Sequence, residues 1–158
     1  SSGNFLYNEF ESYPLLNINY IYKKAGSERK NQNKEFKKII SDLISFLGRN
    51  EKAEFGSINL VFCNDKIIRE YNLKYLRHDY ETDIITFYDR DEEDQTEAEL
   101  LISVETVRSN SVRFRTTYER ELYRVIIHGI LHLCGYKDKT KKQKEIMKKK
   151  ENYYLNLI

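Results

Sequence analysis

The segment FGSINLVFCNDKIIREYNLKYL, from Phe55 to Leu76, decides the fold because a strand signal in it passes directly into a helix signal. Its first part, up to Cys63, is rich in apolar and β-branched side chains, as is typical of a buried strand. Asn64 or Asp65 can then cap a helix that runs to about Leu76. A strand followed at once by a helix indicates an α/β or α+β chain.

The flanking segments extend this alternation. A helix is predicted from Asn33 to Leu47, where apolar residues recur at helical spacing and Gly48 supplies a stop. The other expected elements are a first strand at Asn4–Phe10, strands at Thr82–Phe87 and Glu99–Val104, and helices from Glu105 to about Phe114, at Tyr118–Cys134 with Thr117 as cap, and at about Thr140–Leu155. We therefore expect one α/β (α+β) domain over residues 1–158, a small mixed β-sheet of about four strands packed with about five helices.

Composition narrows the class of protein. The chain has 158 residues, of which 40% are apolar and 33% charged, and its formal net charge is only +2. No apolar run approaches the roughly 18–20 residues that span a bilayer, and the first residues lack the pattern of a secretory signal. We expect Ser1–Gly3 to be a cloning remnant. The two cysteines are expected to be free thiols in a reducing cytoplasm.

Candidate chemistry is concentrated in HGILHLCGYKD, residues 128–138. His128 and His132 are four residues apart, so on a helix both can reach one metal ion. Gly135 can end the helix in the left-handed conformation, and Asp138 can then return to the metal as a third ligand. This spacing resembles the H-x-x-x-H-x-x-G-x-x-[H/D] layout that metzincin proteases use.

Other interpretations of this segment stay open. Two histidines four apart on a helix are often unconnected, and Cys134 is expected to be a core residue and not a ligand. Position 129 is glycine where metalloproteases have the glutamate that acts as base, which disfavours peptide hydrolysis. Three protein ligands leave a position open for water. A bound metal lowers the pKa of that water and neutralises phosphate charge, which suits phosphodiester hydrolysis.

The string HGILHLCGY, followed by a basic helix with Met147 and Glu151, resembles the signature of the bacterial rRNA maturation factor family, the YbeY-type endoribonucleases. A second block, NLKYLRHDYETDIITF from Asn72 to Phe87, is similar to the family pattern N-L-x-[YW]-R-x-K-D-x-P-T-D-V-L-S-F. The resemblance extends from about Phe55 to the C-terminus.

The resemblance implies a metal-dependent endoribonuclease directed at single strands, acting in 3′-end maturation of small-subunit rRNA and in ribosome quality control. It implies one Zn²⁺, other divalent transition metals being possible, with His128 and His132 as ligands. The third family ligand is a histidine, whereas this chain has Asp138. Aspartate is an acceptable zinc ligand, but its charge makes bound water less acidic and its hardness admits other metals more readily.

A family arginine has no direct counterpart, because Leu76 occupies its position and Arg77 follows. We nominate Arg77 as the catalytic residue that holds a phosphate, the alternative being a surface arginine. The lysine-rich last helix is either a solvated face or an RNA-binding surface. Expected partners are single-stranded RNA, in particular small-subunit rRNA, and the ribosome or its proteins, with no membrane and a monomeric chain. Two other functions stay open: a metallohydrolase of another substrate, and a ribosome-associated assembly factor with a largely structural metal.

Overall fold

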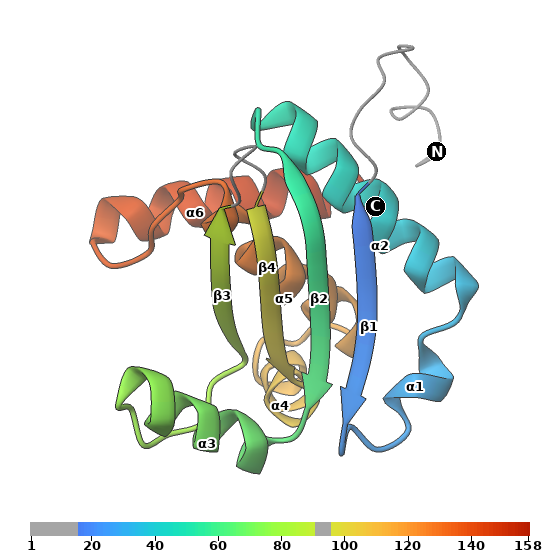
Figure 1. Ribbon diagram of the computed structural model, residues 1–158, viewed down its shortest axis with the longest axis vertical. Helices are drawn as coiled ribbons and strands as arrows, with labels where there is room; N and C mark the ends of the chain where they lie inside the picture. Colours follow the sequence, from blue (N-terminus) through green and yellow to red (C-terminus); the bar gives the residue numbers. More distant parts are fainter. Residues whose placement is uncertain (1–15, 91–95) are drawn as a thin grey trace.

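The computed structural model describes residues 16–90 and 96–158. Within them the elements follow one another as β1 (Asn17–Lys23), α1 (Glu28–Asn31), α2 (Lys34–Asn50), β2 (Phe55–Cys63), α3 (Asp65–Leu76), β3 (Ile84–Arg90), β4 (Thr96–Ser103), α4 (Val104–Arg113), α5 (Tyr118–Leu133) and α6 (Lys141–Leu155). Figure 1 shows them in the order of the chain.

The four strands form one mixed sheet in the order β1-β2-β4-β3. The pairs β1–β2 and β2–β4 are parallel, and β3 runs antiparallel to β4 at the edge. Helices α2, α5 and α6 lie on the same side of this sheet, whereas α3 and α4 lie at the end where β2 and β4 finish (Figure 1). The expected class, a small α/β domain with a mixed sheet, is confirmed.

In the first half of the chain, one expectation is wrong and another falls outside the described residues. The first described strand is Asn17–Lys23, in which Ile18, Tyr20 and Tyr22 pack against the main core while Ile21 packs against a second apolar cluster. The strand expected at Asn4–Phe10 lies outside the described residues. Gly48 does not stop α2, which continues to Asn50. A Cβ at Gly48 would lie 2.9 Å from the Phe55 ring, so this glycine allows close packing inside the helix.

The helix starts were predicted more accurately than the strand limits. Asn64, Thr117 and Thr140 each accept a hydrogen bond from a backbone N–H in the first turn of the helix that follows, which satisfies a donor that has no partner within the helix. Strand β3 begins two residues later than expected, at Ile84, and β4 begins three residues earlier, at Thr96. Neither difference moves the segments that flank the histidine motif.

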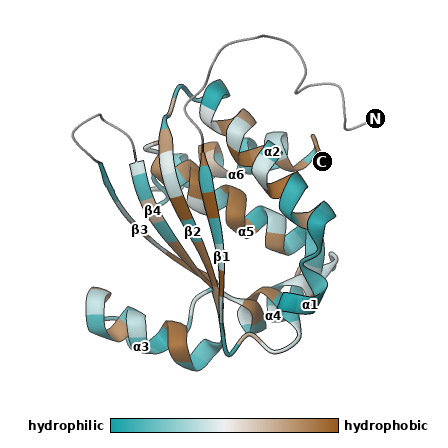
Figure 2. Cartoon of the chain, turned by 45° about the vertical axis from the view of Figure 1, so that its right-hand side comes forward, coloured by the Kyte–Doolittle hydropathy of each residue, from teal (hydrophilic) through white to brown (hydrophobic). Residues whose placement is uncertain are grey.

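Helix α5 lies against β3 and β4 across the main core, and apolar residues are concentrated on α5 and on the strands (Figure 2). The contact is close at Gly129, where a Cβ would lie 2.7 Å from Ile84 Cδ1 and 2.7 Å from Leu100 Cδ2. The glycine therefore lets α5 approach the sheet. Its neighbour His128 is only partly buried, at the edge of the same contact. No helix of the described ranges is both long and apolar enough to span a membrane.

Candidate metal centre

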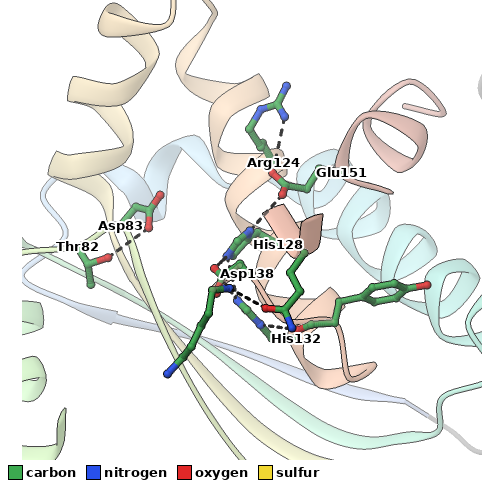
Figure 3. A network of polar contacts seen from close by, with 10 residues as sticks. Thr82, Asp83, Arg124, His128, His132, Asp138 and Glu151 are labelled. Carbon is green, nitrogen blue, oxygen red and sulfur yellow. Dashed lines mark hydrogen bonds and ion pairs between the residues drawn. The ribbon is translucent and has the colours of Figure 1, made fainter. Parts of the chain in front are cut away.

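The structure brings His128, His132 and Asp138 together. His128 Nε2 lies 3.0 Å from His132 Nε2 and 3.2 Å from Asp138 Oδ2, and His132 Nε2 lies 3.4 Å from the same oxygen. The two histidines come from the last turns of α5, and the aspartate comes from the loop that leads to α6 (Figure 3). Among the described residues, these three form the group whose ligand atoms could hold a metal ion.

The spacing of these atoms fits a single small cation. Zinc binds imidazole nitrogen and carboxylate oxygen at roughly 2.0–2.2 Å, so two ligands at tetrahedral angles are about 3.3–3.5 Å apart. The three separations of 3.0, 3.2 and 3.4 Å lie close to that range. A tetrahedral ion with these three ligands would keep one position open for water or substrate.

Hydrogen bonds on the far side of each ring orient the two imidazoles. His132 Nδ1 donates to the backbone oxygen of Tyr136 at 2.9 Å, and His128 Nδ1 donates to Glu151 Oε2 at 3.2 Å. Both partners only accept hydrogen bonds, so each neutral ring has its lone pair on Nε2. Two nitrogen lone pairs and a carboxylate oxygen therefore converge on one point, where a cation would neutralise their repulsion.

The loop that presents Asp138 is fixed from a distant part of the chain. Gly135 has φ = 95°, a conformation that favours glycine and ends α5. The next residue, Tyr136, donates its hydroxyl hydrogen to Glu51, which lies just after α2. Glu51 Oε2 also accepts from Tyr154 at 2.6 Å and from Lys150 at 3.2 Å, both on α6. One carboxylate thus joins α2, the loop and α6.

Carboxylates around the cluster give it a negative field. Burial alone lowers the pKa of His128, but the hydrogen bond and charge of Glu151, with the charges of Asp138 and Asp83, outweigh burial and raise that pKa. Burial raises the pKa of the Asp83 carboxyl, and the nearby His128 lowers it. Asp83 precedes β3 and lies on the far side of His128 from Glu151 in Figure 3. Such a field favours a bound cation.

Among the described residues, no contact joins Arg77 to this cluster. It is the left-handed C-cap of α3, with φ = 57° and an exposed side chain. Its role as the catalytic arginine stays a prediction. The neighbouring Asp79 forms an ion pair with Arg69 Nε at 2.8 Å, which ties the loop to α3. Cys134 packs against the main core as expected, and burial raises its pKa to about 12.

The structure places another arginine beside the site. Arg124 lies one helical turn before His128 on α5, with Nη1 3.7 Å from Glu151 Oε1 and Nε 3.7 Å from Glu121 Oε2. Figure 3 shows Glu151 between Arg124 and His128. Sequence reasoning missed these roles for Arg124, Glu151 and Glu121. A partial signal was present for two of them, because Glu121 and Arg124 are spaced three or four residues apart in series with His128, which places all three on one face of the helix.

The fold and this site define a class: a small α/β domain with a candidate transition-metal centre of the kind found in metallohydrolases. Residues 21–158 match the model of one family, described as Endoribonuclease YbeY. The chain belongs to this family. The match includes both the histidine motif and the loop before β3.

Individual relatives agree with this assignment. Endoribonuclease YbeY of Parabacteroides distasonis is 46% identical over 122 residues, which cover 77% of this chain and 85% of the relative. Endoribonuclease YbeY of Amoebophilus asiaticus is 42% identical over 142 residues, 90% of this chain and 93% of the relative. The solution structure of TM1509 from Thermotoga maritima is similar, with a TM-score of 0.59 and 27% identity, covering 89% of this chain and 87% of that one.

Proposed function

We propose that this chain is a metal-dependent endoribonuclease that hydrolyses phosphodiester bonds in single-stranded RNA, with His128, His132 and Asp138 as the ligands of one Zn²⁺. The observation that supports it is the convergence of two Nε2 atoms and one Oδ2 within 3.4 Å of one another in a member of the Endoribonuclease YbeY family. When bound, the ion would lower the pKa of a water molecule and neutralise negative charge on the phosphate.

The side chains around the ligands have separate tasks. Glu151 and the Tyr136 carbonyl hold the Nδ1 protons, so both rings keep their Nε2 lone pairs directed at the ion. Gly129 is buried against β3 and β4 and offers no proton acceptor, which argues against the usual metalloprotease route. Asp83 is a second carboxyl near the cluster, besides Glu151, that is not assigned as a ligand, and because burial raises its pKa it can exchange protons there.

The proposed substrate is precursor small-subunit rRNA, cut near its 3′ end in the cytoplasm, with the ribosome or its proteins as partners. Part of the lysine-rich helix α6 supports RNA binding, since Lys144 and Lys148 line the hollow beside His128. Cations there attract phosphates in a salt-dependent way. Lys150 differs, because it is engaged with Glu51. Arg77 is proposed to hold a phosphate outside the cluster.

The test uses purified full-length protein and two readouts, zinc content by elemental analysis and cleavage of 16S-type precursor RNA. His132→Ala is expected to abolish both zinc retention and cleavage, and a chelator is expected to stop the wild-type reaction until zinc is restored. His78→Ala is the matched control for zinc content, because His78 is an exposed histidine that contacts Tyr80 and not the cluster. Cleavage that persists in zinc-free His132→Ala protein would exclude the proposal.

The same experiment separates the alternative functions. A ribosome-associated factor with a structural metal predicts that His132→Ala unfolds the chain and that the zinc-loaded wild type cleaves no RNA. A hydrolase of another substrate predicts zinc retention without RNA cleavage. The three-ligand arrangement argues against a structural metal, because structural zinc sites usually have four protein ligands.

A further inference from the structure

A cavity of about 540 Å³ adjoins the metal cluster. Helix α5 forms one wall and α6 the other, and His128 and Asp138 belong to its lining, so a ligand in it would touch the cluster. The volume lies within the range of about 300–1,000 Å³ for small-ligand pockets. It suits a single nucleotide and not a duplex.

An exposed aromatic ring belongs to the lining of this cavity. Phe114, the C-cap residue of α4, lines the cavity and is 57% exposed. Large exposed aromatic rings beside cationic groups are typical stacking platforms for bases. The cations in the cavity lining are Arg124, Lys144 and Lys148.

A carboxylate in the cavity lining has one oxygen without a hydrogen-bond donor in the described part of the chain. Glu121 lines it, is 3% exposed, and its Oε2 accepts no hydrogen bond from any described residue. Arg124 Nε, at 3.7 Å, is too far away for one. A buried acceptor without a donor is costly, so an N–H group from a ligand would stabilise this arrangement.

We propose that this cavity binds one unpaired nucleobase next to the scissile phosphate, stacked on Phe114 with an N–H of its Watson–Crick edge donated to Glu121. A base in a duplex has its N–H donors engaged and its faces covered, so this subsite selects single strands. The inference rests on the proposed nuclease function and names the subsite that sets its selectivity. Arg124 and the α6 lysines then lie where the adjoining phosphates pass.

The test measures binding of a fluorescent single-stranded RNA decamer to the full-length chain by anisotropy, with chelator present so that no cleavage occurs. An abasic site is placed at each position in turn. One position is expected to weaken binding by about 5- to 150-fold, the range for one stacked base. Purine riboside at that position, which retains the ring but lacks N–H donors on that edge, should bind more weakly than adenosine.

Variants of Phe114 connect the effect to this cavity. Phe114→Ala should bind intact RNA more weakly than the wild type. Its binding should not weaken further when the abasic site is placed at the sensitive position. Phe114→Tyr should behave as wild type. Tyr153→Ala is the matched control, since Tyr153 is 51% exposed on α6 and does not line the cavity.

The proposal is overturned if an abasic site weakens RNA binding at no position. It is also overturned if the abasic site weakens binding to Phe114→Ala by the same factor as binding to the wild type. Equal binding of purine riboside and adenosine would remove Glu121 from it. Cleavage of the same RNA with zinc is measured separately. Position-specific binding without any cleavage would exclude the nuclease function and leave the subsite in place. Cleavage without position dependence would exclude the subsite alone.

Discussion

Replacing Glu151 is expected to weaken zinc binding although Glu151 is not a ligand. Its Oε2 accepts from His128 Nδ1 at 3.2 Å, and the residue is only 9% exposed. Without this acceptor the ring can rotate or protonate on the wrong nitrogen. Partners of this kind contribute about 10–100-fold to metal affinity, which corresponds to about 1.4–2.7 kcal/mol.

Two substitutions separate the hydrogen bond from the charge. Glu151→Gln keeps an oxygen acceptor, so we expect a loss of roughly tenfold, and Glu151→Ala removes it, so we expect roughly a hundredfold. The lost contact with Arg124 adds little, because that ion pair is 3.7 Å long and the Arg124 side chain is 30% exposed. The pKa of His128 should fall in both variants, since Glu151 helps to raise it.

Zinc affinity is measured by competition with a fluorescent chelator at about pH 8, where an ordinary imidazole with a pKa of about 6.5 is mostly unprotonated. Nuclear magnetic resonance of the zinc-free variants gives the pKa of His128 independently. Glu145→Gln, the same change at an exposed position of α6, is the control and should bind zinc like the wild type. If Glu151→Ala retains wild-type zinc affinity, the orienting role assigned to Glu151 is refuted.

Three further predictions concern α5 and the ligands. Gly129→Ala gains about 1 kcal/mol of helix propensity, but its Cβ would lie 2.7 Å from Ile84 and Leu100, and this overpacking costs about 1–3 kcal/mol. Urea unfolding should therefore show a free energy of unfolding equal to or lower than that of the wild type. A gain of about 1 kcal/mol would contradict the packing argument. Asp138→His removes a negative charge, so the pH at which cleavage rises should move lower, and an unchanged or higher midpoint would argue against Asp138 as a ligand. Zinc affinity should fall as the pH falls, because both imidazoles must lose their protons to bind. Since the pKa of His128 is raised, zinc affinity should begin to fall at a higher pH than it would with an unperturbed imidazole. A titration of zinc affinity between about pH 5 and 8 measures this.

Local patterns predicted most of the fold because each depends on neighbouring residues. The segment from Phe55 to Leu76 has both elements and the cap within the predicted limits. Gly48 was misinterpreted, since helix-stop rules consider backbone preference whereas the space beside Gly48 is filled by Phe55 after folding. Strand Asn17–Lys23 was overlooked although its alternation is visible in the sequence.

The proximity of His128, His132 and Asp138 was predictable because helix geometry alone relates the two histidines, and a glycine turn brings Asp138 back. The groups around it were not. Arg124 and Glu151 meet only when α6 packs on α5, and no spacing rule along the chain gives that pairing. The nomination of Arg77 relied on alignment to a family pattern, which says nothing about where the left-handed end of α3 directs the side chain.

The most distant contribution to the site comes from Glu51. This carboxylate is separated from Tyr136 by 85 residues, and it also accepts from Tyr154 on α6. Its pKa is lowered: burial alone raises it, but the hydrogen bonds from Tyr136, Tyr154 and Lys150 outweigh burial, so it stays ionised. Tyr136 in turn provides the carbonyl that fixes the proton on His132 Nδ1. The geometry of the metal loop therefore depends on how the end of α2 packs against α6, and the histidine motif by itself does not determine it.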